Sequence, residues 1–155
     1  MKRRIFLKGS LAAGTIAVAA SAGLLTPTRV LASAWPKAAF ESETEAEALQ
    51  AFFGTSDVEQ SDQVSIKAPL QAENGAVVPI KVMTSLENVE GIAICAIKNP
   101  RPYTTSLRVS GGGGGLYSTR IKMGQTSPVN CYVKAGGKLY MASQEIKVTV
   151  GGCGG

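Results

Sequence analysis

One of the three cysteines has a chemical setting unlike the other two. Cys153 lies between Gly151-Gly152 and Gly154-Gly155, directly after a segment that alternates like a strand up to Val150. Glycine packs no side chain and loses more conformational entropy on ordering than any other residue, so four glycines cannot stabilise a fold. We therefore expect residues 151–155 to form a flexible C-terminal arm with an exposed thiol. Five extended residues span up to about 17 Å, enough to enter another protein's cleft.

Nothing in the local sequence should activate the Cys153 thiol. The last seven residues contain no Lys or Arg, and no helix N-terminus is expected there. A reactive thiolate needs such positive surroundings. We interpret Cys153 as an attachment point that other proteins activate, and not as an independent catalyst. The alternative from the residues alone is a disulfide tether between subunits.

The other two cysteines are expected to belong to the core. Cys95 lies in the apolar segment 91–98, and Cys131 lies on the inward face of the segment 128–134. A bridge between them is compatible with this placement but is not established by it. No pair has C-x-x-C spacing, so neither a thioredoxin-type dithiol nor a zinc ribbon is indicated.

The absence of histidine from all 155 residues restricts the chemistry further. It excludes a Ser-His-Asp or Cys-His catalytic pair and any histidine-ligated metal or haem in this chain. The glycine run 111–115 is not a phosphate-binding P-loop, because no Gly-Lys-Ser/Thr and no helix follows it. We expect a protein without catalytic residues, cofactor or metal of its own.

The net charge of +5 comes from the N-terminal segment. Residues 1–34 hold five cations and no acid, whereas residues 35–155 carry 11 basic and 11 acidic side chains. A basic surface for nucleic acid or for a stable membrane contact is therefore not expected in the remainder of the chain.

The same N-terminal segment has the features of an export signal. Arg3 and Arg4 stand in a basic head, an apolar stretch from Gly9 to Leu25 follows, and Ala32-Ser33-Ala34 precedes Trp35. This pattern predicts a cleavable twin-arginine-type signal peptide over residues 1–34 and a periplasmic location. The general secretory route and an uncleaved anchor are the alternatives, although about 17 apolar residues are at the lower limit for a membrane span.

Residues 35–150 are expected to form one domain with a short N-terminal helix. Ser42 and Glu45 form a possible capping box, and Gly54 is placed to end the helix. The remaining periodicity is that of strands. We expect a hairpin turn at Asn74-Gly75, an edge or a bulge at Pro79, and a central strand buried on both faces at 91–98. Further strands are expected at 64–68, 77–83, 104–109, 117–123, 128–134 and 139–150.

About seven short strands with regularly spaced turns favour an all-β fold. We predict an immunoglobulin-like β-sandwich with a short N-terminal helix and the C-terminal arm. The glycine run 111–115 is expected to be a mobile loop, because no regular element tolerates five consecutive glycines.

These features together resemble a known family. The Gly-Gly-Cys-Gly-Gly motif after the segment 145–150, the twin-arginine leader, Asn74-Gly75 with Val78-Pro79-Ile80, and Asn99-Pro100 are similar to the SoxY family of sulfur carriers in periplasmic thiosulfate oxidation. The resemblance covers essentially all of residues 35–155. It implies that Cys153 holds the pathway intermediates covalently and presents them to partner enzymes. No family role passes to Cys131.

The resemblance also implies partners. It implies a heterodimer with a SoxZ-like sandwich subunit, exported as one unit, and transient contacts with the cytochrome SoxAX, the hydrolase SoxB and a sulfur dehydrogenase. Two other classes stay open. An exported binding module would use Cys153 only as a tether, and a thiol oxidoreductase would need a resolving partner for it.

Overall fold

The computed structural model describes residues 35–149, of which residues 36–149 belong to one compact unit. The predicted signal peptide with Arg3 and Arg4 lies outside the described residues. The same is true of the arm at 151–155 with Cys153. Among the helices of residues 35–149, none is long and apolar enough to cross a membrane.

The domain opens with two short helices where we expected one. They are α2 (Lys37–Glu41) and α3 (Glu45–Phe53). The capping box of α3 is formed by Thr44 and Glu47, and not by Ser42 and Glu45 as we predicted. The reason is the extra helix α2, because the Ser42 hydroxyl donates to the Ala38 carbonyl at 2.7 Å. Gly54 ends α3 as expected, with a φ of 77° that favours glycine.

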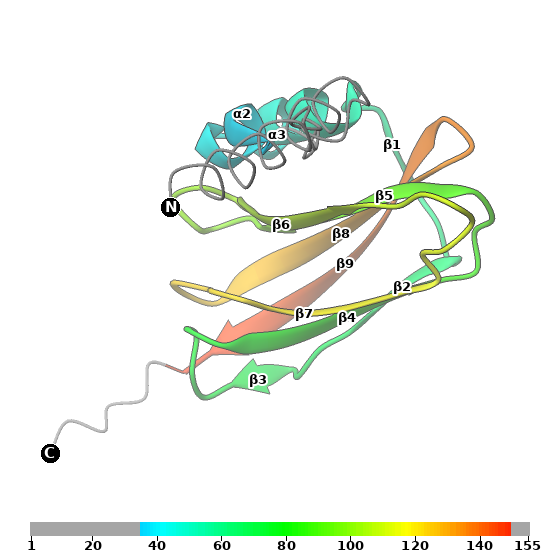
Figure 1. Ribbon diagram of the computed structural model, residues 1–155. Helices are drawn as coiled ribbons and strands as arrows, with labels where there is room; N and C mark the ends of the chain where they lie inside the picture. Colours follow the sequence, from blue (N-terminus) through cyan, green and yellow to red (C-terminus); the bar gives the residue numbers. More distant parts are fainter. Residues whose placement is uncertain (1–34, 150–155) are drawn as a thin grey trace, which may run out of the picture. The chain divides into compact units, whose positions relative to one another are not determined.

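The rest of the domain consists of nine strands in two sheets (Figure 1). The larger sheet has the order β1-β9-β8-β5-β6, with β3 paired to the end of β9, and the smaller sheet has the order β2-β4-β7. The strands are β1 (Val58–Gln60), β2 (Val64–Lys67), β3 (Gln71–Ala72), β4 (Val78–Thr84), β5 (Val89–Ala96), β6 (Tyr103–Arg108), β7 (Leu116–Ile121), β8 (Ser127–Ala135) and β9 (Lys138–Val148). The predicted immunoglobulin-like β-sandwich is confirmed.

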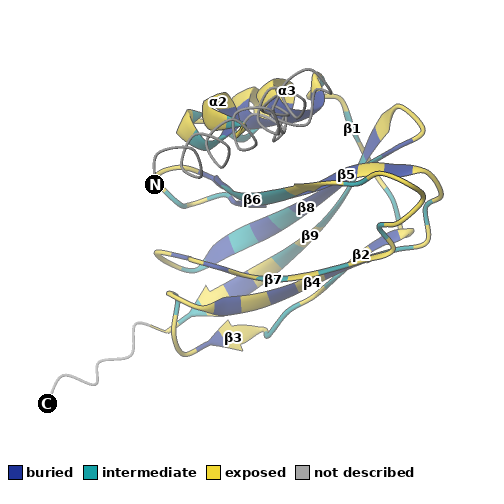
Figure 2. Ribbon diagram, in the orientation of Figure 1, coloured by how far each residue is buried: buried dark blue, intermediate teal, exposed yellow. Residues whose placement is uncertain are grey.

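Two apolar clusters hold these layers together (Figure 2). The first lies between the sheets and includes Val82, Ile92 and Val133. The second lies between the larger sheet and the helices and includes Phe52 and Tyr132. Strand β5 contributes to both clusters, which confirms the prediction of a central strand covered on both faces. Within residues 35–149, no helix covers the outer face of the smaller sheet (Figure 1).

The strands predicted on either side of Asn74-Gly75 do pair with each other, as antiparallel β2 and β4, but β3 lies between them in the chain, so their connection is not a tight hairpin turn. Strand β4 pairs with β2 and β7, whereas β3 pairs in parallel with β9. The turn therefore carries the chain from one sheet to the other. Pro79 lies at a local edge, as expected, although β4 is the middle strand of its sheet. Pairing of β4 with β2 ends at Lys81, so at Pro79 the strand has β7 as its only paired neighbour.

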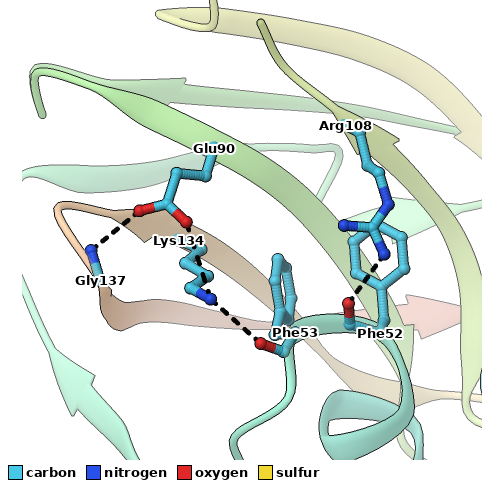
Figure 3. A network of polar contacts seen from close by, with 6 residues as sticks. All are labelled: Phe52, Phe53, Glu90, Arg108, Lys134 and Gly137. Carbon is cyan, nitrogen blue, oxygen red and sulfur yellow. Dashed lines mark hydrogen bonds and ion pairs between the residues drawn. The ribbon is translucent and has the colours of Figure 1, made fainter.

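The C-terminal end of α3 is fastened to the larger sheet by two cations (Figure 3). Lys134 Nζ donates to the Phe53 carbonyl at 3.1 Å and pairs with Glu90 at 3.6 Å. Arg108 donates to the Phe52 carbonyl at 3.1 Å and lies over the Phe52 ring at 4.5 Å. The last carbonyls of a helix have no partner within it and carry partial negative charge. Lys134 and Arg108 therefore have structural roles.

Candidate functional site

The residues that lead to the Cys153 segment belong to the longest strand of the domain. Strand β9 runs antiparallel to β8 over nearly its whole length and buries Leu139 and Ile146. The alternation that predicted a strand up to Val150 is present up to Val148. Because β9 is fixed at both of these buried side chains, its end has a defined position in the domain.

Neighbouring segments hold the end of β9 on several sides. Gln71 and Ala72 of β3 pair with Lys147 and Val148. The Thr149 amide donates to the Ala72 carbonyl at 3.1 Å, and the Val148 amide donates to the Thr126 hydroxyl at 3.0 Å. A segment that begins at residue 150 therefore starts from a point fixed by backbone hydrogen bonds.

Gly75 explains how β9 and the β3–β4 turn come so close together. A Cβ atom at Gly75 would lie within van der Waals overlap of the Met123 carbonyl and 2.9 Å from Val148 Cγ1. The Met123 amide donates to the Gly75 carbonyl at 2.7 Å. Glycine is required here because there is no room for a side chain. The tight turn that the sequence predicted would have required glycine for a different reason, a positive φ.

The other two cysteines are buried on opposite faces of the larger sheet. Cys95 belongs to the cluster under the helices and Cys131 to the cluster between the sheets, and both are 0% exposed. Both are free thiols. Cys95 lies opposite Asn130, and Ile94 lies opposite Cys131, so the two thiols point away from each other. The bridge that the sequence left open is thus not formed, and the expected core roles are confirmed.

Burial also makes both thiols unreactive. It raises the pKa of Cys131 to about 12, and it raises the pKa of Cys95 well above its usual value, with smaller contributions from the charges of Glu45 and Cys131. Only the thiolate is the nucleophile. Neither cysteine can therefore serve as an attachment point in the folded protein.

This gives a prediction for alkylation. At pH 8, iodoacetamide should modify one thiol in the native protein and three in denaturant, and peptide mapping should place the native product on Cys153. Fast native labelling of Cys95 or Cys131 would contradict this account.

The same burial predicts how the stability of the domain depends on pH. Cysteine thiols ionise near pH 8.5 in the unfolded protein, whereas burial raises the pKa of folded Cys131 to about 12. Raising the pH above about 8.5 should therefore favour unfolding.

The described residues offer no constellation for catalysis on a bound metal. Within residues 35–149, no group of three Asp, Glu or Cys side chains could hold an ion. What the domain does provide is a fixed starting point for the segment that contains Cys153. Fold and site together define a small β-sandwich protein with two buried thiols and one further cysteine beyond its last strand.

Comparison with known proteins identifies the family. The sequence model of the family described as "Sulfur oxidation protein SoxY" matches residues 49–153, a range that includes Cys153. The chain therefore belongs to the SoxY family. A search of curated proteins found no match.

Two solved structures resemble the domain. The sulfur carrier protein SoxY from Chlorobium limicola f thiosulfatophilum is 40% identical with a TM-score of 0.60, and the match covers 66% of this chain and 94% of that one. A superoxide reductase (neelaredoxin) from Ignicoccus hospitalis is 15% identical with a TM-score of 0.50, and the match covers 56% of this chain and 80% of that one. The second likeness concerns the fold alone.

Sequence reasoning missed one group of polar residues. Lys67, Lys81 and Ser118 lie side by side across the smaller sheet, because each occupies an outward position at matching register. The sequence shows three well-separated residues in alternating segments. Only the pairing of β2, β4 and β7 brings them together. The turn expected at Asn74-Gly75 places β2 beside β4, but it predicts neither their register nor the position of β7.

Proposed function

We propose that this protein carries sulfur intermediates of thiosulfate oxidation covalently on Cys153. The observation that carries the proposal is the family match, which extends through Cys153, combined with the burial of both other thiols. The related structure at 40% identity is that of a sulfur carrier protein. Cys153 is then the attachment point, and Gly151, Gly152, Gly154 and Gly155 are the arm that lets it enter partner active sites.

Attachment is an oxidation and requires an electron acceptor. The Cys153 thiol and thiosulfate combine to Cys153–S–S–SO₃⁻ with loss of one proton and two electrons, and a c-type cytochrome partner would accept the electrons. Hydrolysis of the terminal sulfonate by one water then releases sulfate and two protons and leaves the persulfide anion Cys153–S–S⁻. The carrier contributes no catalytic group to either step. Replacing Cys153 by serine tests this role directly, because a hydroxyl cannot form the sulfur–sulfur bond.

The sheet edges support association with another sandwich subunit. Strand β6 ends the larger sheet and β7 ends the smaller one, and each has a single paired neighbour. Exposed strand edges favour pairing with other chains. A SoxZ-like partner would cover such an edge, and the transient partners SoxAX, SoxB and a sulfur dehydrogenase would then meet the heterodimer. In the alternative function, an exported binding module, Cys153 would serve only as a disulfide tether.

The proposed location is the periplasm, reached by twin-arginine export of the folded protein. Replacement of Arg3 and Arg4 together by lysine should leave precursor in the cytoplasm, because that pathway reads the arginine pair. The measurement is an immunoblot of periplasmic and cytoplasmic fractions, with Lys2→Arg as a control that keeps the pair. Unchanged periplasmic yield of the double variant would contradict twin-arginine export.

A further inference from the structure

The outer face of the smaller sheet has an unusual distribution of charge. The outward positions of β2, β4 and β7 are Ser65, Lys67, Pro79, Lys81, Met83, Leu116, Ser118 and Arg120. Three of them are cations, and none is Asp or Glu. Residues 35–155 are neutral as a whole, so this face is a local excess of positive charge.

Two of the cations lie directly opposite each other. Lys67 is the register partner of Lys81, and Lys81 is the register partner of Ser118. Side chains at such positions have Cβ atoms about 4.5–5.5 Å apart, and like charges there are unfavourable. Within residues 35–149, neither lysine forms an ion pair. The arrangement therefore lacks the anion that would offset the repulsion.

Three other lysines of this domain form ion pairs or bind a helix end, as expected of lysines with a structural role. Lys134 binds Glu90 and the end of α3, Lys37 pairs with Glu41, and Lys138 pairs with Glu59. Lys67 and Lys81 form no ion pair in the described part of the chain, and the same is true of Lys98, Lys122 and Lys147. What distinguishes Lys67 and Lys81 is their position directly opposite each other.

A hollow lies at this row of side chains. Its volume is about 390 Å³, and it is lined by Lys67, Ala68, Pro69, Pro79, Ile80, Lys81 and Ser118. Lys67, Lys81 and Ser118 all carry hydrogen-bond donors, so the hollow has donors from three neighbouring strands. Contacts between a cation and an oxyanion are among the stronger hydrogen bonds in proteins. The hollow is otherwise lined by apolar residues, so these three donors are what suits it to a small oxyanion.

The chain between Thr149 and Cys153 is long enough to span the distance to the hollow. Thr149 is hydrogen-bonded to Ala72, and Ala68 in the lining precedes Ala72 by four residues. Four residues span at most about 14 Å. Cys153 follows Thr149 by four residues as well, so a group on its sulfur can reach a point about as far away. The span from Thr149 to Cys153 is therefore as long as the span from Ala72 to the lining of the hollow.

We propose that the hollow at Lys67, Lys81 and Ser118 binds sulfur oxyanions. The ligand is the sulfonate end of an adduct on Cys153 or free thiosulfate, which share the same anionic oxygens. For the adduct on Cys153, this inference rests on the proposed carrier function; for free thiosulfate it does not. The site holds the anionic group at the surface of the carrier between its visits to partner enzymes, or it concentrates thiosulfate beside the arm.

The test with free anion uses the whole protein after removal of residues 1–34. Sodium thiosulfate is titrated into ¹⁵N-labelled protein, with sodium chloride at equal ionic strength as the reference. Thiosulfate should shift the amide signals at Lys67, Lys81 and Ser118. In Lys67→Gln/Lys81→Gln its affinity should fall at least about tenfold, because two charged donors are lost. Lys37→Gln/Lys138→Gln removes the same charge elsewhere and should change the affinity less than about twofold.

The test with tethered anion uses the same protein after reaction with tetrathionate. The Cys153 thiolate attacks tetrathionate, forms Cys153–S–S–SO₃⁻ and releases thiosulfate, so no further oxidant is needed. After desalting, the signals at Lys67, Lys81 and Ser118 should be shifted without added anion, and free thiosulfate should bind less well. If free thiosulfate binds but the adduct shifts nothing, the ligand is the free ion.

Controls separate the possible failures. Lys67→Gln/Lys81→Gln should unfold at the same or a higher temperature, because it removes a like-charge pair. Intact mass shows whether Cys153 holds the adduct, so failure of the carrier function is seen separately from failure of the hollow. Equal shifts with chloride, or full thiosulfate affinity in the Lys67→Gln/Lys81→Gln variant, would overturn the proposal.

Discussion

Cys153→Ser should abolish thiosulfate oxidation by the reconstituted pathway while the protein stays folded. Serine is nearly the same size as cysteine but cannot form a sulfur–sulfur bond to thiosulfate. Because Cys153 follows the last strand and stands among four glycines, the free energy of unfolding should change by less than about 0.5 kcal/mol, as for a surface substitution. Oxygen consumption or cytochrome reduction with thiosulfate measures the first effect, and thermal unfolding measures the second.

Cys131→Ala is the matched control for the serine variant. It removes a buried thiol from the cluster between the sheets, so it should destabilise the domain by about 1–2 kcal/mol. At temperatures where it is folded, its turnover should equal that of the wild type. Activity in Cys153→Ser, or loss of activity in folded Cys131→Ala, would show that a different thiol carries the sulfur.

Deletion of Gly151 and Gly152 should reduce pathway turnover strongly although Cys153 remains present. Two fewer residues shorten the reach from Thr149 by about 7 Å. Misplacing a reacting group by even about 1 Å can cost on the order of 10²-fold in rate, so we expect a loss of at least that size. The steady-state rate with thiosulfate is the measurement, and alkylation of Cys153 confirms that its thiol is still accessible.

A second variant separates the length of the arm from its flexibility. Gly151→Ala/Gly152→Ala keeps the number of residues and restricts only the backbone conformations. It should retain more activity than the deletion. If the deletion variant turned over like the wild type, reach would not matter, and Cys153 would need only to be exposed.

The order of strands could be predicted better than their partners. Alternation located most of β2 to β9, and the continuous apolar run identified β5 as the buried central strand. Partner choice depends on contacts between distant segments, which the pattern of one strand does not contain. The strands predicted on either side of Asn74-Gly75 do pair, as β2 and β4, but nothing in the local pattern indicated that β3 lies between them and pairs with β9.

In the candidate site, too, features that depend on neighbouring residues could be predicted, and features that depend on strand pairing could not. The role of Cys153 could be inferred from the sequence because it depends on four neighbouring glycines and on the absence of nearby cations. The sequence could not show that Cys95 and Cys131 lie on opposite faces of the sheet, because this depends on which residues lie opposite each other on β5 and β8. The row of Lys67, Lys81 and Ser118 also depends on register across three strands.

The most direct test of the central claim is the intact mass of the protein isolated from cells oxidising thiosulfate, measured before and after reduction. We predict a mass increment equal to a thiosulfate-derived group or a further sulfur intermediate. It should be removed by reductant, be located on the peptide that contains Cys153, and be absent from cells without thiosulfate. A protein that carries no such increment, or carries it on Cys95 or Cys131, would contradict the account.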